Sequence, residues 1–177
     1  MNDITTQLPP EIDFSSFDFN NLTNSLLPDD VKSKSSGEKY LVFFLGEEYY
    51  AVSTGQVAEA APSLPTTPLP NAPEWLVGIA NLRNEIVSIV SLPTLLKKPR
   101  VAASPKSKLI VLRSAQPDSA PFAAFGADRL NEIISLRDEE IHPAKNEKSP
   151  YICGSAVYST KNLNLIDAEK ILSSLVV

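Results

Sequence analysis

The sequence has 177 residues and a formal net charge of −5, and 43% of its residues are hydrophobic. This length accommodates one ordinary domain or two very small ones. No apolar run approaches the roughly 20 residues that span a bilayer, so we expect a protein that is not inserted in a membrane. The first residues lack the pattern of a secretory signal, and the single Cys153 cannot form an internal disulfide, so we expect a cytoplasmic location.

Residues 1–38 are predicted to form a flexible, acidic N-terminal tail. Residues 1–39 hold seven of the 21 acidic side chains and three of the 16 basic ones, which leaves the remainder nearly neutral. A nearly neutral domain lacks the positive charge that attracts phosphates, so no nucleic-acid partner is expected. Within the tail, Phe19, Leu22 and Leu26 are spaced as one face of a short helix, which leaves open a segment that docks on a partner.

From Tyr40 onward the pattern predicts short strands separated by turns. The segments YLVFFL and EYYAV are rich in aromatic and β-branched residues and are joined by Gly46 and Glu47, which indicates a tight hairpin. Further segments of this kind are VGIANL, EIVSIVSL, KLIVLR, PFAAFGA, NEIISL, YICGSAVYS and LNLID. Many short strands without long helical patterns between them favour an all-β fold with minor helix, built from closed antiparallel barrels.

Three segments interrupt the strand pattern. APSLPTTPLPNAP carries five prolines, which cannot donate to a sheet ladder, so it is predicted to be an extended connector or edge strand. A polyproline ligand for an aromatic groove is the less favoured alternative. The segments SLPTLLKK and AEKILSSL are predicted to form short helices, the second of which Asp167 can cap.

Residue types used in catalysis or metal binding do not form a recognisable site in this sequence. His142 has no Cys or His neighbours, and Cys153 lies in an apolar strand, where we expect it to be buried. Asp138, Glu139 and Glu140 are consecutive, so their side chains splay apart and we expect a solvated acidic turn. No nucleophile elbow, phosphate-binding loop or dinucleotide-binding turn occurs. We therefore expect no enzymatic activity, no cofactor and no metal.

The stretch GIANLRNEIVSIVSL, residues 78–92, places a polar turn between two apolar strands. Its turn is predicted to centre on Arg83 and Asn84, because asparagine tolerates the positive φ that tight hairpin turns require. The arginine would then lie at a rigid tip. It could bind a partner there, or it could form only a surface ion pair with Glu59 or Glu85, which contributes about 0 to 1 kcal/mol.

This stretch, together with FFLGEEYYAV upstream, resembles the CheW-like domain of bacterial chemotaxis coupling proteins. FAAFGADRLNEIISLRDEEIHP and YICGSAVYSTKNLNLIDAEKIL continue the pattern, so the resemblance covers about residues 39–175. The chain departs from the family at three places. Asn84 stands where glycine is usual, Ser91 stands where aspartate is usual, and the residues Lys97, Lys98 and Pro99 stand where glycine follows the short helix.

The resemblance implies two small five-stranded SH3-like β-barrels that share a hydrophobic core. The first barrel would cover about residues 39–96 and the second about 106–167, followed by a C-terminal helix at 168–175. It also implies a non-catalytic adaptor that couples the cytoplasmic tip of a chemoreceptor to the regulatory domain of a CheA-type histidine kinase, in flagellar, type IV pilus or phototaxis signalling. A generic SH3-like or OB-like barrel that binds proteins outside chemotaxis is the alternative.

By position in the family pattern, four residues map to the receptor-binding groove: Val57, Glu59, Gly78 and Arg83. The resemblance places the Glu59 carboxylate where it could orient the guanidinium of Arg83. Gly78 is as well explained by backbone packing as by contact with a partner.

Overall fold

A computed structural model describes residues 37–99, 107–114, 123–144 and 149–175. The strands in these ranges are β1 Glu38–Leu45, β2 Glu48–Ser53, β3 Val57–Pro62, β4 Thr66–Thr67, β5 Leu76–Leu82, β6 Glu85–Val90, β7 Lys108–Leu112, β8 Ala123–Ala127, β9 Arg129–Leu136, β10 His142–Pro143, β11 Ile152–Tyr158 and β12 Lys161–Ile166. The α-helices are α1 Leu92–Leu95 and α2 Ala168–Ser173, and the 3-10 helices are η2 Thr54–Gln56 and η3 Asp138–Glu140. The helix-spaced residues Phe19, Leu22 and Leu26 lie outside the described residues.

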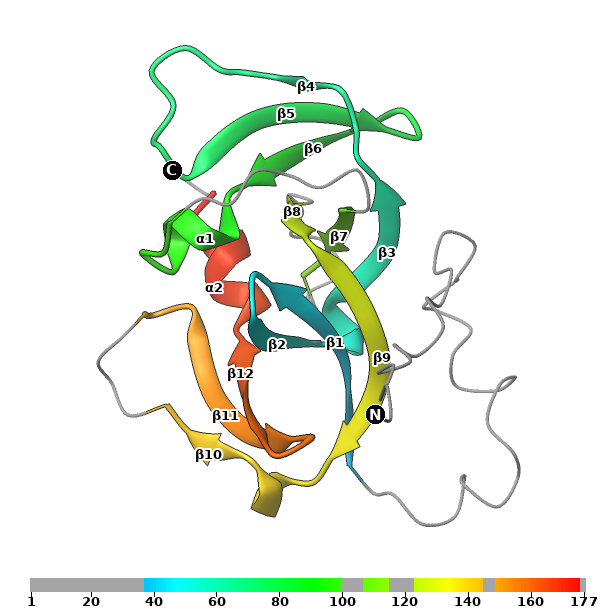
Figure 1. Ribbon diagram of the computed structural model, residues 1–177. Coiled ribbons are helices and arrows are strands. Elements are labelled where there is room, and N and C mark those ends of the chain that lie inside the picture. The colour runs from blue at the N-terminus through cyan, green and yellow to red at the C-terminus, as the bar shows by residue number, and fades with distance from the viewer. Residues whose placement is uncertain (1–36, 100–106, 115–122, 145–148, 176–177) are drawn as a thin grey trace, which may run out of the picture.

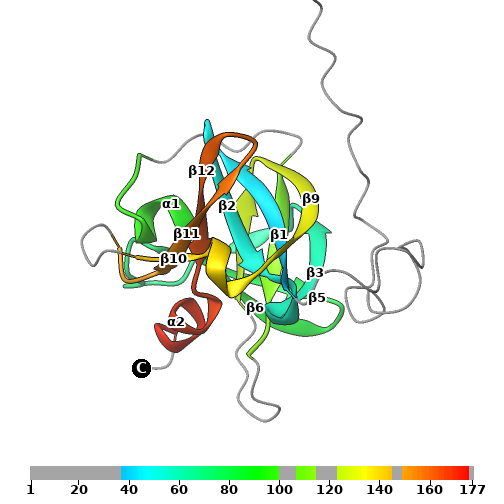
Figure 2. The same cartoon turned by 90° about the horizontal axis from the view of Figure 1, so that it is seen from below.

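The strands form two six-stranded sheets, with the orders β10-β11-β12-β2-β1-β9 and β3-β7-β8-β6-β5-β4. We call them sheet A and sheet B. Each has five longer strands and a two-residue sixth strand, β10 or β4. The two edge strands of each sheet are consecutive strands of the chain. Each sheet is strongly curved, so that its two edges approach each other (Figure 1). Figure 2 shows the curvature of sheet A from below. The predicted all-β fold with minor helix is confirmed.

Strand pairing crosses the expected boundary between the two halves of the chain. The hairpin β1–β2 comes from the first half, yet it pairs in sheet A with β9 and, in parallel, with β12. The hairpin β7–β8 comes from the second half, yet it pairs in sheet B with β3 and, in parallel, with β6. Each sheet therefore takes strands from both halves of the chain, and neither corresponds to an expected barrel of residues 39–96 or 106–167. Patterns within one strand carry no information about which distant strand will pair with it.

Buried residues fall into three apolar clusters. One lies inside sheet A and includes Val42 and Leu163, and another lies inside sheet B and includes Val87 and Val111. The largest lies between the sheets and receives residues from both of them and from α1 and α2. Figure 1 shows both helices in this middle layer. The expected shared core is thus present, and it places opposite faces of β1 and β7 in different clusters, which explains their continuous apolar sequences.

An internal repeat relates the two sheets. The β5–β6 and β11–β12 hairpins have the same register 76 residues apart, including a bulge just before Gly78 and just before Gly154. Each hairpin leads into a short helix whose cap lies at the corresponding position, Ser91 for α1 and Asp167 for α2. Both cap side chains accept a hydrogen bond from the backbone three residues later, so the predicted cap at Asp167 is confirmed.

The proline-rich segment forms the edge of sheet B. Thr66 and Thr67, which make up β4, pair with Ala80 and Ile79 of β5. Pro65 and Pro68 flank this short pairing, and Pro62 ends the edge strand β3, which are positions where strands tolerate proline. The prediction of an edge strand is confirmed.

Candidate partner-binding site

The turn between β5 and β6 holds Arg83 in a constrained backbone conformation. Arg83 has φ 51° and Asn84 has φ 69°, so both lie in the left-handed region, as the sequence predicted for this turn. The side-chain oxygen of Asn81 accepts a hydrogen bond from the Asn84 N–H at 3.0 Å, which fixes the turn. A left-handed conformation costs a residue with a Cβ about 1 to 2 kcal/mol. A two-residue hairpin turn requires this conformation, so the turn fixes the backbone that carries the Arg83 side chain.

Glu59 lies on β3, directly after a β-bulge. Val57 pairs with Leu112, whereas Glu59 pairs with Val111, so one residue of β3 has no opposite partner. Bulges change the direction of the side chains that follow them and are frequent beside functional sites. Here the bulge lies between Val57, which belongs to the shared core, and Glu59, whose side chain reaches the Arg83 turn.

Arg83 and Glu59 form an ion pair across sheet B. The distance from Nη2 of Arg83 to Oε2 of Glu59 is 2.9 Å. The arginine side chain is 78% exposed, whereas that of the glutamate is 19% exposed. A pair this exposed stabilises the fold by about 0 to 1 kcal/mol. Its main effect is to hold a largely exposed guanidinium in one direction.

Gly78 is explained by close backbone packing. It is buried, has φ 153°, and a Cβ placed on it would lie 2.2 Å from the carbonyl oxygen of Thr67. Only glycine therefore allows β4 to lie this close to β5. Val57 is fully buried in the shared core. Of the four candidate residues, the structure brings Glu59 and Arg83 together at the surface, while Val57 and Gly78 support the strands that carry or flank them.

An exposed isoleucine, Ile86, lies next to the Arg83 turn and was not predicted as a site residue from the sequence. Ile86 of β6 is 69% exposed, although Val87 and Ile89 on the same strand are buried. The alternation along β6 is the signal that could have identified it, because a strand with Val87 and Ile89 inward turns Ile86 outward. The β5–β6 hairpin thus presents one cation and one apolar side chain.

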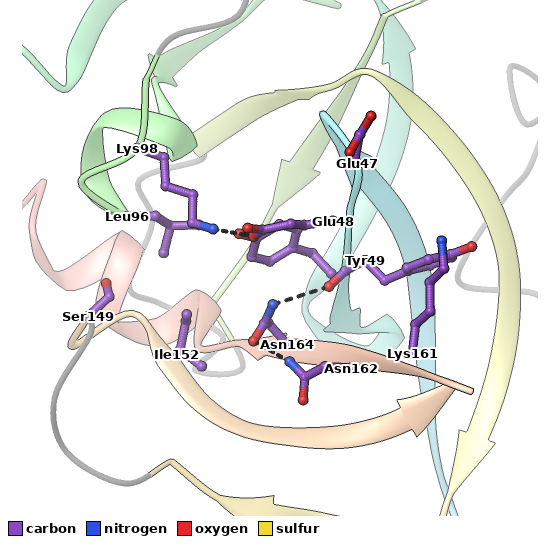
Figure 3. A pocket seen from close by; sticks show the side chains of 11 residues that line it. Glu47, Glu48, Tyr49, Leu96, Lys98, Ser149, Ile152, Lys161, Asn162 and Asn164 are labelled. Atoms are coloured by element: carbon purple, nitrogen blue, oxygen red, sulfur yellow. Dashed lines mark hydrogen bonds and ion pairs between the residues drawn. The ribbon is translucent and has the colours of Figure 1, made fainter. Parts of the chain in front are cut away.

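A hollow of about 370 Å³ lies away from this pair, between sheet A and the end of α1 (Figure 3). Its lining includes Glu48, Tyr50, Lys98, Asn162 and Asn164. Lys98 forms an ion pair with Glu48, which also accepts a hydrogen bond from the Tyr50 hydroxyl at 2.5 Å. Burial and this carboxylate raise the pKa of Tyr50. The two asparagines are joined at 2.9 Å, so much of the polar lining is already satisfied within the protein.

The residues considered for chemistry are dispersed in the structure. His142 is exposed, and Asp138, Glu139 and Glu140 form the exposed helix η3, as expected for a solvated acidic turn. The expectation of a buried Cys153 is wrong, because this residue is exposed on the outer face of β11. Partial desolvation of its sulfur and the nearby Asp167 raise the pKa of the Cys153 thiol.

The part of the chain that the structure describes contains no candidate metal site and no candidate membrane-spanning helix. No three His, Cys, Asp or Glu residues in the described ranges are grouped so that they could hold a metal ion. Among the helices of those ranges, none is long and apolar enough to cross a membrane.

Comparison with known proteins identifies the family. A family model described as the CheW-like domain matches residues 39–176. The chain belongs to the CheW-like family.

Two curated relatives and one solved structure agree with this assignment. The chain is 30% identical over 148 residues to "Chemotaxis protein CheW" of Klebsiella aerogenes, covering 81% of this chain and 87% of that protein. It is 24% identical over 141 residues to the protein of the same name from Bacillus subtilis, covering 77% and 88%. The crystal structure of scaffolding protein TtCheW from Thermoanaerobacter tengcongensis matches with a TM-score of 0.67 and 25% identity, over 74% of this chain and 84% of that one. The CheW-like chain is therefore a chemotaxis adaptor, or scaffold, protein.

Proposed function

We propose that this CheW-like protein couples chemoreceptors to a CheA-type histidine kinase in the cytoplasm and performs no catalysis of its own. The family assignment and the relatives' names support a role in chemotaxis and scaffolding. The observation that carries the receptor part of the proposal is the Glu59–Arg83 pair, which holds an exposed guanidinium at a rigid turn.

Arg83 has the physical properties of an anchor for a receptor tip. Its planar guanidinium carries five N–H donors, and the ion pair with Glu59 engages it through Nη2. Donors that remain can bind carboxylates or carbonyl oxygens of a partner. Because the turn and Glu59 already restrict the side chain, docking loses less conformational entropy than it would with a free arginine. Ile86 on the same hairpin adds exposed apolar area.

The substitution Arg83→Glu tests the proposal. It should weaken receptor-tip binding by about 2 to 5 kcal/mol if the site is desolvated on docking, because two carboxylates would then face each other and the partner. The fold should be retained, since an exposed turn residue can reverse its charge without opening a cavity. Affinities for a receptor cytoplasmic tip and for the kinase regulatory domain are measured by calorimetry on one preparation, together with the melting temperature.

The matched control for this test is Lys161→Glu, which makes the same charge change beside the turn of the equivalent hairpin in sheet A. It should leave the affinity for the receptor tip unchanged. If Arg83→Glu melts normally and still binds the tip as tightly as the unchanged protein, the receptor site lies elsewhere. If it unfolds, the Glu59–Arg83 pair has a structural role instead.

A further inference from the structure

The C-terminal helix contacts the segment that leads into Glu59. Glu169, in the first turn of α2, accepts a hydrogen bond from the side-chain amide of Gln56 at 3.4 Å. The Ser114 hydroxyl donates to the same carboxylate at 3.2 Å. Gln56 ends η2, and Ser114 follows β7. One carboxylate therefore joins α2 to η2, which precedes β3, and to the segment that follows β7, the strand paired with β3.

The beginning of β3 is held on two sides. The Gln56 carbonyl accepts a hydrogen bond from the Arg113 N–H at 3.0 Å, which continues the pairing of β3 with β7. The next residue, Val57, is fully buried in the cluster that also contains Ile171 and Leu172 of α2. Val57 and the apolar face of α2 thus belong to one cluster, and Glu169 adds a polar bond from α2 to Gln56.

The direction of Glu59 depends on where β3 begins. The bulge separates Val57 from Glu59, which pairs with Val111 on the far side of it, so the bend of β3 at this bulge sets the direction of the Glu59 side chain. A shift of Gln56, two residues before the bulged residue, therefore changes the bend that directs Glu59. The carboxylate of Glu59 in turn holds the Arg83 guanidinium.

We infer that Glu169 is a positioning residue for the Glu59–Arg83 pair. By fixing Gln56, it sets the start of β3 and the direction of the Glu59 carboxylate, and so couples the C-terminal helix to the candidate partner-binding site. The consequence for receptor binding rests on the proposed function. The positioning itself is a property of the free protein and is measured without any partner.

The first arm of the experiment observes Arg83 directly in the full chain. The ¹H–¹⁵N signal of the Arg83 side-chain Nε–H is recorded for the unchanged protein and for Glu59→Gln, which gives the signal of an arginine without its carboxylate. Glu169→Ala should move the signal toward that reference. Lys170→Ala, which removes the exposed neighbouring side chain on α2, should leave the signal in place.

Two further variants separate positioning from general destabilisation. Glu169→Gln keeps an oxygen that can accept from Gln56, so it should restore the signal of the unchanged protein. In a Gln56→Ala background, Glu169→Ala should cause no further shift, because the intermediary is already gone. If Glu169→Ala leaves the Arg83 signal unchanged, or if its effect is undiminished without the Gln56 side chain, the inference is wrong.

The second arm measures binding to the receptor tip and to the kinase regulatory domain. Glu169→Ala should weaken tip binding roughly threefold to tenfold, a size typical of indirect coupling, and should leave kinase binding unchanged. A moved Arg83 signal with unchanged tip affinity would contradict the receptor site and leave the positioning role intact. An unmoved signal, with tip binding still sensitive to Arg83→Glu, would contradict the positioning role and leave the receptor site intact.

Discussion

Lys97 shows at the scale of one residue how this chain ends a helix without glycine. Helix α1 ends in a Schellman motif, in which the Lys98 N–H donates to the Pro93 carbonyl at 2.8 Å and the Lys97 N–H donates to that of Thr94 at 3.0 Å. This motif requires a left-handed residue, and Lys97 fills it with φ 56°. Glycine, which is common at the end of such motifs, would adopt the same φ without steric cost.

We expect Lys97→Gly to raise the free energy of unfolding by about 0.5 to 1 kcal/mol, because relief of the left-handed strain exceeds the entropy cost of glycine. Urea denaturation measures the change. Lys98→Gly is the control, and it should lower stability because it removes the ion pair with Glu48. A Lys97→Gly protein less stable than the unchanged one would show that the lysine side chain makes a favourable interaction.

At the scale of elements, Gly78 determines whether β4 can pair with β5 at the edge of sheet B. We expect Gly78→Ala to destabilise the protein by about 1 to 3 kcal/mol, since its Cβ would overlap the Thr67 carbonyl. Hydrogen exchange should accelerate at the amides of β4 and β5 before it does elsewhere.

Gly126→Ala serves as the control for this substitution, because a Cβ on Gly126 meets nothing within 4 Å. It should be neutral or slightly stabilising, as the added Cβ reduces the freedom of the unfolded chain. Equal stability of the two variants would mean that β4 does not need its close approach to β5.

Local features of these elements could be predicted from the sequence, and contacts between distant elements could not. The Gly46 hairpin, the Arg83–Asn84 turn and the Asp167 cap each depend on a few adjacent residues, and the structure confirms them. The parallel pairs β6–β8 and β2–β12 join strands far apart in sequence. The internal repeat left only a faint signal, the Gly-x-Ala spacing shared by residues 78–80 and 154–156.

The candidate site could likewise be predicted only in part from the sequence. The family pattern indicated Glu59 and Arg83, and the structure places them 2.9 Å apart. It also indicated Val57 and Gly78, whose burial no local pattern revealed. Glu169 could not be foreseen, because its bond to Gln56 joins residues 113 positions apart.

At the scale of the whole molecule, the exchange of hairpins between the halves predicts that neither half folds alone. A fragment ending at Leu96 would lack β9 and β12 beside β1–β2, and β7 and β8 beside β3 and β6. The apolar faces that form the shared core would then be exposed, so we expect an aggregated or molten fragment. Sharp, dispersed amide signals from residues 37–96 alone would contradict this interdependence.

The most direct test of the adaptor role asks whether one molecule holds both partners at once. The full chain is mixed with a receptor cytoplasmic tip and the kinase regulatory domain, and the mixture is analysed by size-exclusion chromatography with light scattering. We predict a ternary complex that contains all three proteins, and a binary complex with the kinase domain alone when the chain carries Arg83→Glu. Mutually exclusive binding, or no binding of either partner by the unchanged chain, would contradict it.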